Sequence, residues 1–167
     1  MHGINLKYYC LIISLLLLSN CNKANVTPDI NTYLSIQNQY SSEYFIGIGN
    51  GSGNTEQLAI KIAKTKALGA LSENVKVTIL SKAEMNTSEI SDGTNSQFSQ
   101  SFEQKIISIG NATIRSPEYE ILDISSKKGV LHAQVLAKKL KAEHIKEAAN
   151  DLDFGSDTDQ LLELITK

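Results

Sequence analysis

A run of alternating glycines, from Gly47 to Gly53, is the first stretch of this sequence whose residue types could do chemistry. It stands between an expected strand and an expected helix, where nucleotide-binding loops lie. The third glycine of a dinucleotide fingerprint is absent, because Ser52 or Asn54 stands in its place. A phosphate loop also fails, since the next lysine is Lys61. We therefore expect a structural turn over Gly47–Asn54, with weak anion binding by main-chain N–H groups as the alternative.

Histidines and carboxylates offer no better site. His132 and His144 lack a second His or Cys at the three- or four-residue spacing of a zinc site. An EF-hand in the acidic C-terminal cluster fails at Gly155 and Ser156, so we expect its carboxylates to solvate a turn and the start of the last helix. No Gly-x-Ser-x-Gly elbow occurs. We expect no catalytic, metal-binding or cofactor-binding residue, and so no enzyme. The cluster comprises Asp151, Asp153, Asp157 and Asp159.

Cys21 is the residue to which the sequence assigns a specific reaction. The apolar run Tyr8–Leu18 would rise about 16 Å as a helix, which is too short for a bilayer core of about 30 Å but suits a secretory signal. The run ends Leu18-Ser-Asn-Cys21, which resembles a bacterial lipobox, in which the cysteine becomes the acylated N-terminus. The only other cysteine, Cys10, would be removed with the signal, so no disulfide can form. The alternative is an ordinary cleaved signal with an incidental cysteine.

Three regions follow from this pattern. We expect a signal peptide over residues 1–20, a flexible tether over residues 21–42 behind the acylated cysteine, and one folded domain over residues 43–167. The tether is rich in Asn, Ser, Gln and Thr and shows no sustained hydrophobic period. Tyr33, Leu34 and Ile36 could dock a short piece of it on the domain.

Hydrophobic periodicity within the domain predicts an α+β fold. We expect a two-layer domain in which helices pack on a small mixed or antiparallel sheet, in the order β-α-β-α-β-β-α-α. Pro117 interrupts the fifth element, so that strand is bulged there, lies at a sheet edge or begins after the proline. The expected elements are strand Tyr44–Ile48, helix Thr55–Glu73, strand Val75–Lys82, helix Phe98–Ile109, strand Ala112–Ile124, strand Val130–Ala137, helix Lys138–Leu152 and helix Thr158–Ile165.

An alanine stripe marks how the first helix packs. The stripe recurs at helical spacing, and such small residues let a helix axis approach a flat partner closely. We expect that partner to be the sheet. The stripe consists of Ala59, Ala63, Ala67 and Ala70.

Composition limits the partners. The chain has 167 residues, a net charge of −2 and a single arginine, Arg115. A face that binds phosphates needs clustered Lys and Arg, so we expect no nucleic acid as a partner.

The helix and its surroundings resemble the Lpp-twenty family of bacterial surface lipoproteins over roughly residues 43–145. That resemblance implies a small α+β domain anchored to the outer membrane, facing the periplasm or the surface, with no catalytic residues to carry over. Some members, such as the flagellar lipoprotein P type, build rings around the flagellar motor. The matching stretches are the aromatic-glycine strand Tyr44–Gly47, the alanine-rich basic helix Ala59–Leu71, Val75 and Val77 with Ser81, and the glycine-led strand Gly129–Ala137.

We therefore expect a lipid-anchored envelope protein that acts as a structural, assembly or interaction module. The resemblance extends this expectation to an association of the protein with the flagellum. Its expected partners are the membrane, reached through Cys21, other envelope or flagellar proteins, and further copies of itself. An unpaired edge strand, such as the one that carries Pro117, would be the physical means of association. The alternative is a periplasmic ligand-binding lipoprotein with a groove beside the glycines, and an envelope hydrolase is the weakest candidate.

Overall fold

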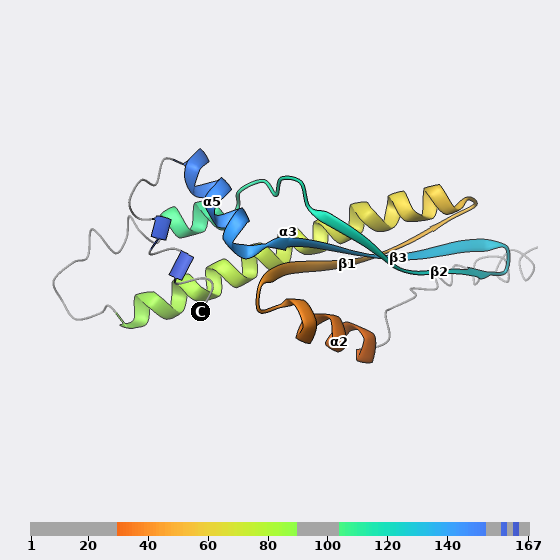
Figure 1. Cartoon of the computed structure of the whole chain (residues 1–167), viewed down its shortest axis with the longest axis horizontal. Coiled ribbons are helices and arrows are strands. Elements are labelled where there is room, and N and C mark those ends of the chain that lie inside the picture. Colours follow the sequence, from red (N-terminus) through yellow and green to blue (C-terminus); the bar gives the residue numbers. More distant parts are fainter. Residues whose placement is uncertain (1–29, 90–103, 153–157, 160–161, 164–167) are drawn as a thin grey trace, which may run out of the picture.

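The computed structural model describes residues 30–89, 104–152, 158–159 and 162–163. One antiparallel sheet has the strand order β1-β3-β2, with α3 on one face and α2 against the other (Figure 1). Helices layered on an antiparallel sheet confirm the predicted α+β class. The elements are α2 (Ile30–Tyr40), β1 (Tyr44–Gly53), α3 (Glu56–Glu89), a helix over residues 104–110, β2 (Glu118–Lys127), β3 (Val130–Leu140) and α5 (Lys141–Asp151).

The alternating glycines lie in strand β1, so the predicted turn over Gly47–Asn54 is wrong. A Cβ on Gly49 would lie 2.2 Å from both the Ala63 carbonyl oxygen and the Ala67 amide nitrogen. Gly47 and Gly51 are equally close to the main chain of α3. Two strand residues advance about 6.6 Å and one four-residue helical step about 6 Å, so glycines and alanines stay nearly in register. The absence of side chains at these glycines allows the main chain of α3 to contact β1 directly.

The alanine stripe packs on the sheet as predicted, but its last member differs. Ala59, Ala63 and Ala67 are buried, whereas Ala70 is exposed. Leu71 continues the stripe instead, since four-residue spacing and not three keeps a side chain over β1.

Helix α3 continues to Glu89, so the predicted strand Val75–Lys82 is wrong. Val75 and Ile79 are buried and continue the four-residue stripe, while Val77 is 56% exposed. The alternation of these three residues fits a strand, but the buried pair also fits a helix that packs on Phe45 and Ile106. The shared core therefore selects the helix.

The strands predicted over Ala112–Ile124 and Val130–Ala137 correspond to β2 and β3, which pair as a hairpin. Its two-residue turn, Lys128-Gly129, has positive φ at both residues (54° and 77°), as in a type I′ turn. β2 begins directly after Pro117 and occupies a sheet edge, two of the three outcomes that the proline allowed.

Residues 21–42 were expected to form a flexible tether, but Ile30–Tyr40 is helix α2. Ile36 is buried against Ile46 of β1 and Leu136 of β3, whereas Tyr33 and Leu34 are exposed. The apolar contact of one residue thus docks the helix on the outer face of the sheet. The residues before Ile30 lie outside the described part of the chain.

Two predicted helices are shifted or only partly described. Helix α5 begins at Lys141 and not at Lys138, because the ladder of β3 runs to Leu140. The predicted Phe98–Ile109 helix is present over 104–110, and its earlier residues lie outside the described ones. Residues 158–159 and 162–163 are helical, as expected for the last element.

The contact of α3 with β1 makes a stability prediction. In Gly49→Ala the added methyl group meets main-chain atoms that no rotamer change can move, and we expect a loss of about 3 kcal/mol in the free energy of unfolding. The matched control is Gly69→Ala, at an exposed position on α3 where a Cβ meets no atom within 4 Å. It should gain about 0.8 kcal/mol from helix propensity. Urea denaturation of both variants measures this, and similar stabilities would contradict the proposed packing.

Candidate interaction surface

Strand β2 is the element of the sheet that the rest of the described chain leaves most open. Its residues are exposed on both faces apart from the half-buried Leu122. The apolar Ile121 is 48% exposed, and Tyr119 and Ile124 are exposed as well. An apolar strand with this exposure marks a surface where another chain can bind.

The pairing with β3 places the apolar residues of β2 on the face that α3 occupies. Tyr119 is opposite Ala137, and Ile121 is opposite Val135, both buried against α3. Directly paired residues point to the same face of a sheet. The register then shifts between Ile121 and Asp123, so a bulge at Leu122 adds one residue to the strand.

Simple alternation along the strand would place Asp123 beside Tyr119 and Ile121, but the bulge changes this. With one extra residue, Ile124 pairs with Ala133 and joins the α3 face, while Asp123 pairs with Gln134 on the other. The result is an unbroken apolar row on one face of the edge strand.

A groove of about 490 Å³ lies between this face of β2 and α3. Its floor is apolar, and the aliphatic stem of Lys64 brings its ammonium 5.2 Å from the centre of the Tyr119 ring. Of its described lining residues, two are lysines and none is a carboxylate. The lining comprises Gln57, Ile60, Lys61, Lys64, Thr65, Leu68 and Tyr119.

Strand β1 forms the second edge of the sheet, but α3 covers it in part. The main-chain N–H of Ile46 donates to Asn74 Oδ1 of α3 (3.4 Å). β2 has few contacts with α3, among them that of Lys64 with the Tyr119 ring. On the outer face, the Lys138 ammonium lies 3.7 Å from the carboxylates of both Glu118 and Glu120. The edge of the sheet at β2 is therefore more accessible than the edge at β1, and the face of β2 on the α3 side is open.

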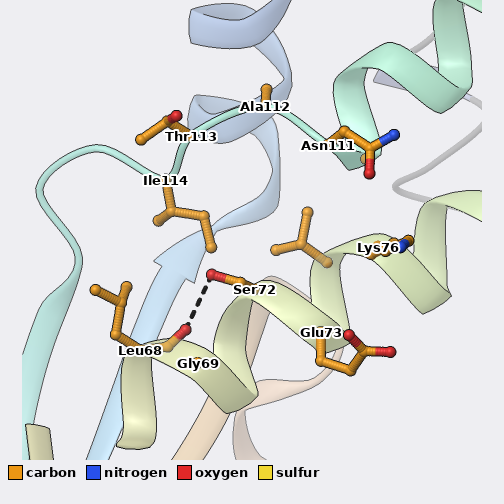
Figure 2. A pocket seen from close by; sticks show the side chains of 11 residues that line it. Leu68, Gly69, Ser72, Glu73, Lys76, Asn111, Ala112, Thr113 and Ile114 are labelled. Carbon is orange, nitrogen blue, oxygen red and sulfur yellow. Dashed lines mark hydrogen bonds between the residues drawn. The ribbon is translucent and has the colours of Figure 1, made fainter. Parts of the chain in front are cut away.

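A second groove of about 370 Å³ lies between α3 and residues 110–114 (Figure 2). Ser72, Glu73 and Lys76 line it from α3, and Asn111 and Thr113 line it from the opposite segment. The Ser72 hydroxyl already donates to the Leu68 carbonyl (3.0 Å). This groove is the structure's nearest counterpart to the ligand site of the alternative hypothesis, but it does not lie beside the glycines as that hypothesis expected.

The predicted chemical residues are not brought together. His132 lies on β3 with its Nδ1 2.9 Å from the Ser52 hydroxyl, whereas His144 is buried on α5. Asp151 forms an ion pair with Arg115 (2.8 Å) at the surface. Within the described residues no three His, Cys, Asp or Glu side chains are placed to hold a metal ion.

A buried polar cluster at the start of α5 was not predicted from the sequence. The Lys139 side chain is 2% exposed, and its ammonium lies 3.0 Å from both Glu143 and Glu147. Burial would lower the pKa of Lys139, but the hydrogen bonds and charges of the two glutamates outweigh it and raise the pKa. The Lys139/Glu143 spacing of four residues was the available signal, although it gave no hint of burial.

His144 lies in the same region with neither ring nitrogen in hydrogen-bond geometry to the described residues. Its ring meets Phe45 edge to face, with centroids 5.8 Å apart. Burial lowers the pKa of His144, and Lys139 adds to this, while the Ile109 main chain and Glu147 oppose it. A neutral, buried imidazole packs α5 onto the core.

Cys21, the predicted lipidation site, lies outside the described residues. Within the described part of the chain, no helix is both long and apolar enough to cross a membrane.

The buried imidazole predicts acid sensitivity. Because folding lowers the pKa of His144 below its ordinary 6.5, the unfolded chain takes up a proton first as the pH falls. Stability should therefore fall from about pH 6.5 down to the folded-state pKa, by up to about 1.4 kcal/mol per pH unit. His144→Leu and His144→Phe should flatten this slope in urea titrations at several pH values. An unchanged slope in both variants would assign the acid loss to other groups.

Comparisons with known proteins leave the chain without a family. No protein-family model and no curated protein matches it. Among solved structures, it is similar to a secreted protein from the human pathogen Helicobacter pylori, with a TM-score of 0.31 and 12% sequence identity. The match covers 71% of this chain and 52% of that one, so the chain spans about half the length of that protein. At these values the similarity assigns neither fold nor function.

Proposed function

We propose that this chain is a non-enzymatic, lipid-anchored envelope protein that works as an assembly or protein-interaction module. The single observation that carries the proposal is the open β2 strand, which combines a main-chain edge that no described strand pairs with and an exposed apolar row. Unpaired strand edges are surfaces on which other chains add, and soluble proteins usually protect them. Here the bulge at Leu122 enlarges the apolar row, although the charges of Glu118 and Glu120 limit uncontrolled pairing.

The anchor in this proposal is Cys21. The lipobox-like Leu18-Ser-Asn-Cys21 supports acylation after removal of residues 1–20, and a doubly or triply acylated cysteine would hold the domain stably at a membrane. Membership of the Lpp-twenty lipoproteins, an outer-membrane location and a flagellar role are parts of the same proposal. They rest on the sequence resemblance described above.

A ligand-binding lipoprotein is the second candidate, and the groove of Figure 2 is the observation in its favour. Small-molecule sites bury most of their ligand and converge a few polar groups on it. In this groove Ser72, Glu73, Asn111 and Thr113 are exposed, and the Ser72 hydroxyl is occupied within its own helix. The open apolar strand therefore favours the interaction module.

Fatty-acid labelling tests the anchor. Cells that express the full chain with radioactive palmitate should give a labelled, membrane-bound protein, and Cys21→Ala should abolish the label and release the protein from membranes. Cys10→Ala is the control, because this cysteine lies inside the removed signal and its loss should leave labelling unchanged. A labelled Cys21→Ala chain, or an unlabelled wild type, would overturn the lipoprotein assignment.

Sedimentation of the full chain extracted from membranes tests the module. We expect a particle larger than one chain, reduced in size by Ile121→Asp, which places a charge in the apolar row. Lys66→Asp, an exposed change on α3 outside the groove, is the control. A single-chain particle, or one that Ile121→Asp leaves intact, would count against β2 as the interaction surface.

A further inference from the structure

We infer that the groove between α3 and β2 is the docking site for an amphipathic α-helix of a partner protein. This helix would carry acidic side chains along its flank, the side of the helix that lies next to α3. This inference rests on the proposed function and specifies the partner of that module. It follows from the width, the lining and the charge of the groove.

The width of the groove matches one helix. α3 touches the main chain of β1, and β2 lies two strand spacings away, at about 9.6 Å. Packed helices have axes about 8–10 Å apart, depending on the side chains at the contact. A second helix packed beside α3 would therefore lie directly over β2, where Tyr119, Ile121 and Ile124 are exposed.

The lining suits the apolar face of a helix. Ile60 and Leu68 on α3 are partly buried on the edge of the core and line the groove together with Tyr119 of β2. From Gln57 to Leu68 the groove follows about 17 Å of α3, the length of about three helical turns. A partner helix with apolar residues at positions i, i+3, i+4 and i+7 would fill it.

The charge of the groove selects an acidic flank. Lys61 and Lys64 lie along the α3 side, and among the described residues no carboxylate lines the groove. The carboxylates of β2 at Glu120 and Asp123 belong to the opposite face of the sheet by their pairing with Leu136 and Gln134. A partner with Glu or Asp along the flank next to α3 would gain charge pairing, and one with Lys or Arg there would be repelled.

An extended strand is the competing occupant, because no other strand among the described residues pairs with the edge of β2. Strand addition alone would add a strand beside β2 and leave the apolar face of β2 open, since α3 packs mainly on β1 and β3. A helix would bury the exposed apolar row. Burial of these apolar side chains contributes more binding free energy than pairing at the strand edge alone. We therefore assign the groove to a helix.

Three synthetic peptides of about twelve residues test the inference with the full acylated chain in detergent micelles. The first is an amphipathic Leu/Ala helix with a glutamate flank, the second replaces the glutamates with lysines, and the third rearranges the first into a strand-like alternation. Fluorescence anisotropy measures binding, circular dichroism measures induced helix, and micelles without protein give the background. We expect the glutamate helix to bind at least about tenfold more tightly than the other two peptides.

Two variants locate the binding. Ile121→Asn should weaken the glutamate helix about tenfold, and the double change Lys61→Glu/Lys64→Glu should make the lysine helix the preferred peptide. Lys66→Glu is the matched control on the same helix outside the groove and should change neither peptide's affinity. Thermal denaturation of each variant verifies folding.

Equal binding of the acidic and basic helices, tightest binding of the strand peptide, or a preference that the double change leaves unreversed would each overturn the inference. A dimer of the full chain that Ile121→Asn separates, with no peptide bound, would assign the groove to a second copy instead. In that case, or if no peptide binds while Ile121→Asp still reduces the membrane-extracted particle, the interaction module stands and only the helical partner is wrong.

Discussion

The contact between the main chain of α3 and the glycines of β1 fixes the position of everything else in the domain. A helix normally stands on a sheet at a distance set by interlocked side chains, but here one layer of side chains is missing. Gly47, Gly49 and Gly51 leave room for the helix backbone, and Ala59, Ala63 and Ala67 supply the matching small residues. Close packing of this kind allows little lateral movement, because any shift brings a main-chain atom into collision.

This close contact places α3 over β1, toward one edge of the face that it covers. β1 and β3 are covered, and β2 is left with its apolar residues uncovered on the same face. The bulge at Leu122 then keeps Ile124 in line with Tyr119 and Ile121. The open groove thus follows from the asymmetry of a single helix on three strands, and the proposed partner would occupy the place of a second helix.

The opposite end of the domain is closed by charge as well as by packing. Lys139 ends the inner row of β3 opposite Phe45 and is neutralised by two glutamates of α5. A buried lysine without these partners would be costly, so the two glutamates offset the burial of its charge while Ile145, Ala148 and Ala149 pack α5 on the core. His144 packs beside them with its ring edge to face against Phe45, and burial lowers its pKa.

The sequence by itself determined the hairpin, the alanine helix and the α+β class, because each depends on local geometry or short periodicity. Lys128-Gly129 forms a tight turn from its own residues, and the spacing of Ala59, Ala63 and Ala67 defines a helix face. It did not reveal the groove. Only the tertiary structure decided that the glycines form a strand, because a glycine's freedom fits a turn and a close contact equally well. It also decided that Val75 and Ile79 belong to a helix, because their spacing fits both periods until the core formed by Phe45 and Ile106 selects one.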